Sequence, residues 1–188
     1  MTPTDFVAGL ADVMGVARTE LATVDRALAK RGLRQLARGR ARPDITLAEG
    51  VQLACAWAGA ESLTLAADEV ERLKRFNLVI EPTTAIQRDF AEVFGADTDE
   101  LIGRDFLDVV PMIARQLVAE KYPAKNIWIA VEKGGSVEIG YWTKRGWASL
   151  RFVELSDSFS FVQKRNVSVT VTIRGPVLKW ISEVTEGS

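Results

Sequence analysis

The segment LADVMGVARTELATVDRAL, Leu10–Leu28, has the pattern of two short helices joined by a tight turn. Gly15 is expected in the positive-φ position of that turn, because glycine has no Cβ to oppose this conformation. Ala11 is small enough to let the second helix cross close to the first, and Val16 is expected to fill the crossing point. The apolar positions of the second helix repeat at spacings of three and four residues, which places one face inward: Leu21, Val24 and Leu28.

This pattern resembles the helix-turn-helix of bacterial and phage DNA-binding proteins, over about residues 4–30. The resemblance implies that the second helix presents its outer face to a DNA groove, where arginines bind guanine edges or phosphates and threonines bind phosphate or base. The implied DNA-facing positions are Ala17, Arg18, Thr19, Ala22, Thr23 and Arg26. Asp25 is expected near this same side. The alternative interpretation of the residues is an ordinary pair of antiparallel helices.

A basic segment follows directly. Residues 30–42 read KRGLRQLARGRAR, in which six of thirteen residues are basic and none is acidic. Such a segment is typical of a wing or arm that lies along phosphates or in a minor groove, although a solvated linker has the same composition. Its predicted DNA-binding residues are Lys30, Arg34, Arg38, Arg40 and Arg42.

The composition excludes several classes of protein. A hydrophobic fraction of 47% and a charged fraction of 26% in 188 residues are typical of a soluble globular chain. We expect a cytoplasmic protein that does not contact a membrane, since no apolar run approaches the roughly 18 residues of a membrane span and the N-terminus lacks the order of a signal peptide. The single cysteine, Cys55, excludes an intrachain disulfide framework and is expected in the core.

The chain contains no histidine, which removes histidine-based catalysis and most zinc and iron sites. It also lacks a glycine-rich phosphate loop and the nucleophile elbow of hydrolases. We therefore expect that the protein is not an enzyme and takes no metal and no cofactor.

Charge is distributed unevenly along the chain. Residues 1–44 carry a net charge of +3, residues 61–110 carry −7 and residues 111–188 carry +4. The acidic middle is therefore expected to face away from nucleic acid. Three regions are predicted: a helix-turn-helix DNA-binding domain with its basic loop (1–60), a helical acidic middle (61–122), and an antiparallel β domain for oligomerisation or sensing (123–188).

The predicted elements give an α+β fold class: an N-terminal helix-turn-helix domain, a helical middle, and a small C-terminal antiparallel sheet with a closing helix. Thr4 is a candidate N-cap of the first helix, Gly32 should end the second, and Thr46 and Glu49 form a capping box for the third. Helices are expected over residues 4–14, 18–30, 47–58, 64–76, from 84 onward, and 97–120 with a kink or break at Pro111.

The 64–76 helix is expected to turn its apolar residues inward: Leu65, Val70, Leu73 and Phe76. Strands are predicted at 126–132, 137–143, 146–153, 158–163 and 167–173, and a short helix at 177–183. Residues 167–173 alternate apolar and hydroxyl side chains, which indicates a strand with one buried face.

The stretch Tyr141–Trp147, YWTKRGW, interleaves aromatic and basic residues at the expected turn between two strands. Single-stranded nucleic acid can stack on such aromatic side chains. Strand ends whose tryptophans close a hydrophobic core have the same sequence, and we favour this second interpretation.

These observations predict a sequence-specific DNA-binding protein, a bacterial or phage transcriptional regulator that binds double-stranded DNA as a homo-oligomer. A dimer is favoured because half-sites lie one helical turn apart. One alternative is a phage small terminase subunit, which shares the order of helix-turn-helix head, helical middle and β-rich tail. Another is a protein-interaction module, such as a phage-encoded inhibitor of a host system.

Overall fold

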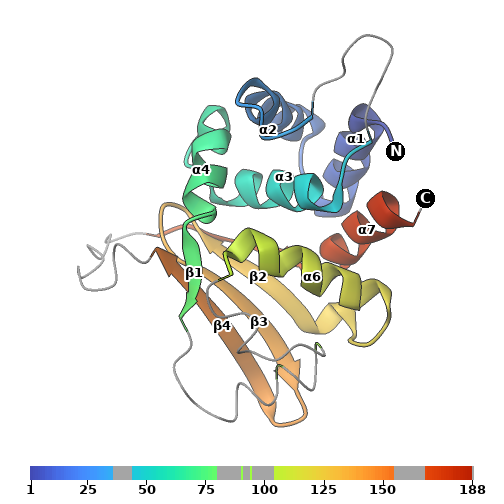
Figure 1. The fold of residues 1–188 in the computed structure, drawn as a ribbon, viewed down its shortest axis with the longest axis vertical. Coiled ribbons are helices and arrows are strands. Elements are labelled where there is room, and N and C mark those ends of the chain that lie inside the picture. Colours follow the sequence, from blue (N-terminus) through green and yellow to red (C-terminus); the bar gives the residue numbers. More distant parts are fainter. Residues whose placement is uncertain (36–43, 80–89, 91–93, 95–103, 155–167, 188) are drawn as a thin grey trace.

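The computed structural model describes residues 1–35, 44–79, 90, 94, 104–154 and 168–187. These residues form a mixed α+β fold with six α-helices and an antiparallel sheet of strand order β1-β4-β3-β2-β5 (Figure 1), which confirms the predicted class. The helices are α1 (Pro3–Met14), α2 (Arg18–Lys30), α3 (Leu47–Gly59), α4 (Ala66–Leu73), α6 (Phe106–Val118) and α7 (Gly175–Glu186). The strands are β1 (Phe76–Val79), β2 (Ile127–Glu132), β3 (Val137–Thr143), β4 (Gly146–Glu154) and β5 (Thr170–Arg174).

The turn between α1 and α2 has the predicted conformation. Gly15 lies in the left-handed region, at φ 69° and ψ 35°, and α2 begins three residues later at Arg18. The predicted inward positions of the pair are buried: Ala11, Leu21, Val24 and Leu28. Local chemistry thus specifies this helix pair correctly.

The predicted N-cap of α1 is wrong by two residues. Thr2, rather than Thr4, is the N-cap, and its Oγ1 accepts a hydrogen bond of 3.3 Å from the backbone N–H of Asp5. Pro3 stands at the first helical position, where its missing N–H has no helical partner to lose and its fixed φ suits the helix.

Helix α3 lies between the α1–α2 pair and the sheet (Figure 1), and it contacts α2, α4, α6, α7 and two strands. The predicted capping box is present, because Thr46 and Glu49 each accept a hydrogen bond from the other's backbone N–H. Many of its core-facing residues are small, so neighbouring elements approach closely. A Cβ on Gly50, for example, would stand 2.7 Å from both Phe6 Cζ and Ile181 Cγ2.

The predicted helix over 64–76 is divided in the structure. A 3₁₀ turn spans Leu63–Leu65, α4 follows, and the chain enters β1 at Phe76. Leu65 is half exposed, so its predicted inward position is wrong, whereas Val70 and Leu73 are buried. Phe76 is buried in a strand because residues 76–79 pair with β4, and this long-range pairing overrides the local helical pattern.

Helix α6 begins at Phe106 rather than continuing from residue 97. Asp105 caps it, since its side chain accepts a hydrogen bond of 2.9 Å from the backbone N–H of Asp108. Pro111 is buried inside the helix, which continues unbroken to Val118. The expected acidic first turn at 97–100, the helix start at Thr84 and the strand at 158–163 lie outside the described residues.

The predicted strands at 126–132, 137–143 and 146–153 are confirmed as β2, β3 and β4, and the fifth is shortened to β5. Alternate side chains of these strands are buried under α3, α6 and α7, so one face of the sheet holds the core. Helix α7 is longer than predicted at both ends. No helix in the described parts of the chain is long and apolar enough to cross a membrane.

One cluster of buried side chains runs through all three predicted regions. The Phe6 ring of α1 lies 5.4 Å from the Trp180 ring of α7, centroid to centroid. Arg72 of α4 donates a hydrogen bond of 2.6 Å to the carbonyl oxygen of Gly135 in the β2–β3 turn. The N-terminal helices therefore pack against the sheet and the helices that cover it. The division of the chain into three regions stays a prediction.

Candidate nucleic-acid interface

The outer side of α2 carries most of the residues expected to face DNA. Arg18, Thr19, Arg26 and Lys30 are exposed, and Ala22 and Thr23 are partly buried. Ala17 is exposed at the N-cap and makes no side-chain capping bond, so the first turn of α2 keeps backbone N–H groups without a side-chain acceptor. A phosphate placed there would meet the positive end of the helix dipole.

Arg18 is held against the end of α1. Its guanidinium donates to both carboxylate oxygens of Asp12, at 3.1 and 2.8 Å from Nη2. Both side chains are more than 60% exposed, at 64% and 61%. An exposed pair of this kind is worth about 0–1 kcal/mol, so Arg18 can exchange Asp12 for a phosphate or a base at little cost.

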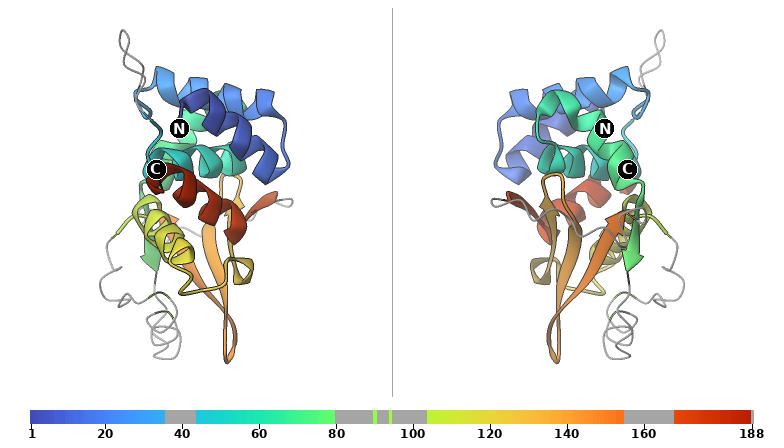
Figure 2. Two further views of the ribbon diagram at one scale, coloured as in Figure 1. Left: turned by 90° about the vertical axis from the view of Figure 1, so that its right-hand side faces the viewer. Right: turned by 90° about the vertical axis from the view of Figure 1, so that its left-hand side faces the viewer.

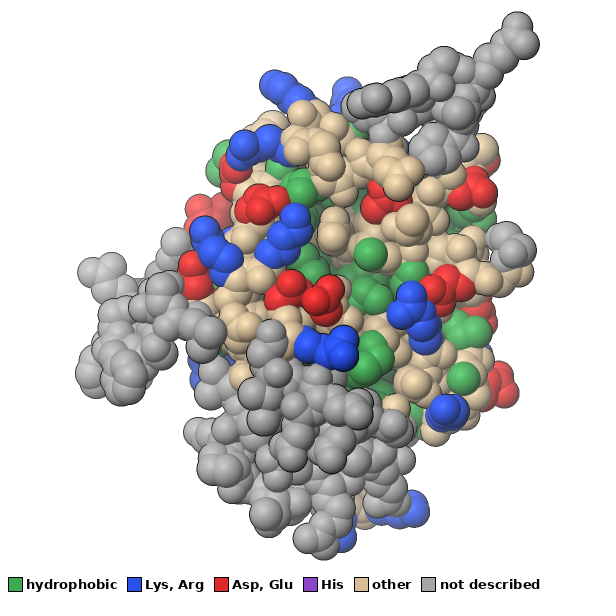
Figure 3. Space-filling model, viewed as in Figure 1, with side chains coloured by type: hydrophobic (Ala, Val, Ile, Leu, Met, Phe, Trp, Pro, Cys, Tyr) green, Lys and Arg blue, Asp and Glu red, His purple; other side chains and the backbone are tan. Residues whose placement is uncertain are grey.

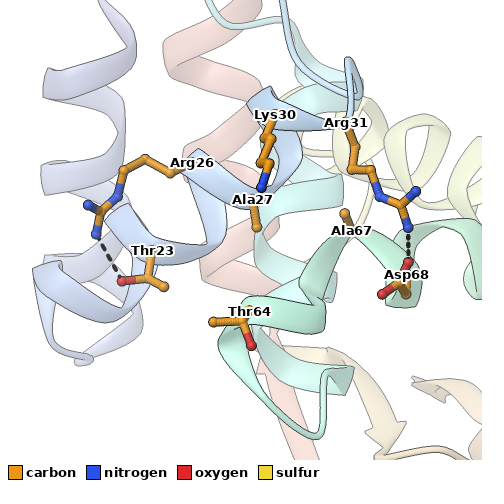
Figure 4. Close-up of a pocket in the computed structure, with 8 residues that line it drawn as sticks. All are labelled: Thr23, Arg26, Ala27, Lys30, Arg31, Thr64, Ala67 and Asp68. Carbon is orange, nitrogen blue, oxygen red and sulfur yellow. Dashed lines mark hydrogen bonds and ion pairs between the residues drawn. The ribbon is translucent and has the colours of Figure 1, made fainter.

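Arg26 lies back along α2 (Figure 4). Its Nε donates to the carbonyl oxygen of Ala22 at 3.1 Å and its Nη2 to Thr23 Oγ1 at 3.2 Å. Thr23 Oγ1 in turn donates to the carbonyl oxygen of Thr19 at 2.8 Å. These bonds place the Arg26 guanidinium beside the Thr23 hydroxyl.

Asp25 does not lie on the exposed side, contrary to expectation. It forms an ion pair with Arg34 in which both side chains are only 13% exposed, and Arg34 Nη2 donates to Asp25 Oδ2 at 3.0 Å. Burial raises the pKa of Asp25, and the Arg34 charge opposes that rise. Arg34, predicted to bind DNA, is therefore turned inward and neutralises the acid that would have repelled phosphate.

An open groove of about 500 Å³ runs between α2 and α4 (Figure 4). Arg31, which the sequence interpretation did not assign to the interface, crosses it to form an ion pair with Asp68. Its lining contains more arginine and lysine residues than acidic residues. The lining residues are Thr23, Arg26, Ala27, Lys30, Arg31, Thr64, Ala67 and Asp68. The groove was not visible in the sequence because α4 reaches α2 only through the tertiary fold.

The carboxylate of Glu49 binds the chain at two points, one on each side of residues 36–43. Glu49 Oε1 accepts from the backbone N–H of Gln35 at 2.7 Å, and Oε2 accepts from that of Thr46 at 2.9 Å. Residues 35 and 46 are thereby fixed at the start of α3, beside the end of α2. The predicted contacts Arg38, Arg40 and Arg42 lie outside the described residues.

Lys and Arg side chains stand out at the top of the molecule in Figure 3, where α2 lies in the same view. The other acid of α2, Glu20, accepts a hydrogen bond of 3.0 Å from Trp57 Nε1 on α3. Both acids of α2 are thus engaged by inward partners, and the side that faces solvent is basic and hydroxyl-rich.

No protein-family model matches the chain, and neither does any curated protein or solved structure with which it was compared. Among the described residues, no group of three or more acidic or cysteine side chains is arranged to hold a metal ion.

Proposed function

We propose that the protein is a sequence-specific DNA-binding regulator that presents α2 to the major groove as the second helix of a helix-turn-helix. The inward ion pair of Asp25 and Arg34 carries this proposal. It removes the one acid expected beside the DNA and leaves Arg18, Thr19 and Arg26 on the exposed side. Arginine pairs with guanine edges and phosphates, and threonine hydroxyls with phosphates, so this set suits combined base and backbone contact.

The surroundings of α2 support the same proposal. Lys30 and Arg31 continue the basic surface to the helix end and beyond it, and both line the groove of about 500 Å³ between α2 and α4. Gln35, the last described residue before the predicted contacts Arg38, Arg40 and Arg42, is held by Glu49 at the start of α3. Duplex bound along α2 would thus pass from the helix N-terminus to the α2–α4 groove.

The test is selection from a randomised duplex library, followed by anisotropy titration of the enriched duplex at several salt concentrations. The Arg18→Ala/Arg26→Ala variant should bind at least about tenfold more weakly, because each well-placed arginine–guanine pair is worth about 1–3 kcal/mol. The matched control is Arg75→Ala/Arg115→Ala, which removes the same charge from exposed ion pairs elsewhere. An enriched motif with unchanged affinity in the α2 variant, or no duplex binding at about 50 mM salt, would contradict the proposal.

A further inference from the structure

Three tryptophans share the face of the sheet that points away from the core. Trp142 and Trp147 are directly opposite each other on β3 and β4, and are 51% and 61% exposed. The favoured expectation that these tryptophans close a core is therefore wrong. Their strand neighbours Tyr141 and Leu150 are buried on the other face, because successive side chains alternate.

Trp128 of β2 extends this surface. It is paired with Gly140 of β3, so it stands diagonally beside Trp142. A Cβ on Gly140 would lie 2.2 Å from Trp128 Cε2, which shows that the indole occupies the space over the glycine. Diagonal neighbours in a sheet lie about 7–8 Å apart, within reach of aromatic rings. The set Trp128, Trp142 and Trp147, here the tryptophan face, is thus contiguous.

The tryptophan face lies at the basic end of the sheet. Lys144 and Arg145 are exposed in the β3–β4 turn between Trp142 and Trp147, and Arg174 is paired with Trp128 on the other side. The acidic residues of the described strands, by contrast, lie toward the opposite end: Glu132, Glu138 and Glu154. An anionic ligand would therefore be attracted to the end that carries the exposed rings.

We propose that the tryptophan face binds single-stranded nucleic acid, with bases stacked on Trp142 and Trp147 and the phosphate backbone beside Lys144 and Arg145. Exposed planar rings next to cations match the two components of a single strand, its base faces and its phosphates. A duplex lacks the first component, since its bases are already stacked on one another.

This surface is distinct from the one proposed for duplex DNA. The β3–β4 hairpin and α2 lie at opposite ends of the molecule in every view (Figures 1 and 2). The two surfaces can therefore be altered independently, and the failure of one proposal would leave the other standing.

The experiment is anisotropy titration of a labelled oligothymidylate of about 15 nucleotides, a length that matches single-strand sites, at about 50 mM salt. Two double variants distinguish base stacking on the indole rings from hydrophobic contact with any apolar side chain. Trp142→Leu/Trp147→Leu keeps apolar side chains but removes the ring faces, and should weaken binding at least about tenfold. Trp142→Phe/Trp147→Phe keeps smaller ring faces and should retain affinity within about threefold. Arg18→Ala/Arg26→Ala should leave oligothymidylate binding unchanged.

Sedimentation velocity on the wild type and the leucine variant completes the test. Oligothymidylate binding that is lost in the leucine variant and retained in the phenylalanine variant supports the proposal. Absence of binding to the wild type, or equal binding by the leucine variant, overturns it. A dimer that dissociates in the leucine variant, without oligothymidylate binding by the wild type, also overturns it and makes this face an interface between copies of the chain.

Discussion

Replacing Phe6 by alanine should destabilise the whole molecule rather than α1 alone. The ring is fully buried where three helices meet: it packs on Trp180 of α7, and its Cζ lies close to where a Cβ of Gly50 would stand on α3. The cavity left by truncation would be bounded by separate elements, none of which can collapse into it without disturbing the others.

The expected loss is about 4 kcal/mol, within the range of about 3–5 kcal/mol for buried Phe→Ala changes. Since small domains are stable by about 5–15 kcal/mol, this loss is a large share of the total. Val13→Ala is the matched control on the same helix, because Val13 is 39% exposed. Its expected effect is within about 0.5 kcal/mol of zero.

The assay is urea unfolding followed by far-UV circular dichroism and by tryptophan fluorescence, to which the sheet contributes three of the five tryptophans. For Phe6→Ala, the two signals should change together at a lower urea concentration. A loss below about 1 kcal/mol, or a helix transition that moves while the fluorescence transition stays fixed, would refute the argument that the α1–α2 pair and the sheet share one cooperative core.

Three further predictions concern single positions. Arg34→Met should raise the pKa of Asp25 further above its ordinary value of 3.8, because burial then acts unopposed by the Arg34 charge. The folded state would hold a proton on Asp25 that the unfolded chain releases. The free energy of unfolding should therefore fall more steeply in the variant than in wild type as pH rises from about 4 to 7. If the unfolding free energies from urea titrations fell equally with pH in both proteins, this prediction would be contradicted. Cys55 is fully buried, and its pKa is raised to about 12 by burial and then by the Glu69 charge. It should not react with a thiol reagent at about pH 8 until urea unfolds the protein. Rapid reaction in the native state would contradict this burial. Gly15→Ala should lower stability by about 1–2 kcal/mol, because its φ of 69° is costly for alanine while the site has no neighbour within 4 Å; an unchanged urea midpoint would show that the turn relaxes.

The features that the sequence predicted correctly are specified locally. The Gly15 turn depends on one residue's lack of a Cβ, and the Thr46–Glu49 box on two residues three apart. The β2–β3 hairpin depends on the alternating strands and the glycine turn between them, where Gly134 has φ 65°. Each of these choices is made within a few residues, so the sequence pattern alone is sufficient.

The features that it missed depend on residues far apart in the chain. Phe76 continues an apolar helical pattern, yet its segment pairs with β4 about 75 residues later, across the register Phe76↔Glu154. The exposure of Trp142 and Trp147 follows from which face of the sheet the helices cover, which the alternation within one strand does not determine.

At the candidate interface, the sequence predicted that Arg18, Thr19 and Arg26 lie on the exposed side of α2, but it did not predict how the charges of this region pair. Asp25 and Arg34 are nine positions apart, and their ion pair forms because the chain turns back after α2. Arg31 and Asp68 meet across the groove in the same way. Charge counting along the chain does not reveal either pair, and only the fold shows which charges are engaged with one another.

The most direct test of the central claim, that α2 contacts duplex DNA, is to follow the arginine side-chain Nε–Hε signals by NMR as the selected duplex is added. The proposal predicts that the signals of Arg18 and Arg26 shift in proportion to binding, while those of Arg75 and Arg115 stay in place. Saturable duplex binding with unmoved Arg18 and Arg26 signals would contradict it and would place the DNA on another surface of the protein.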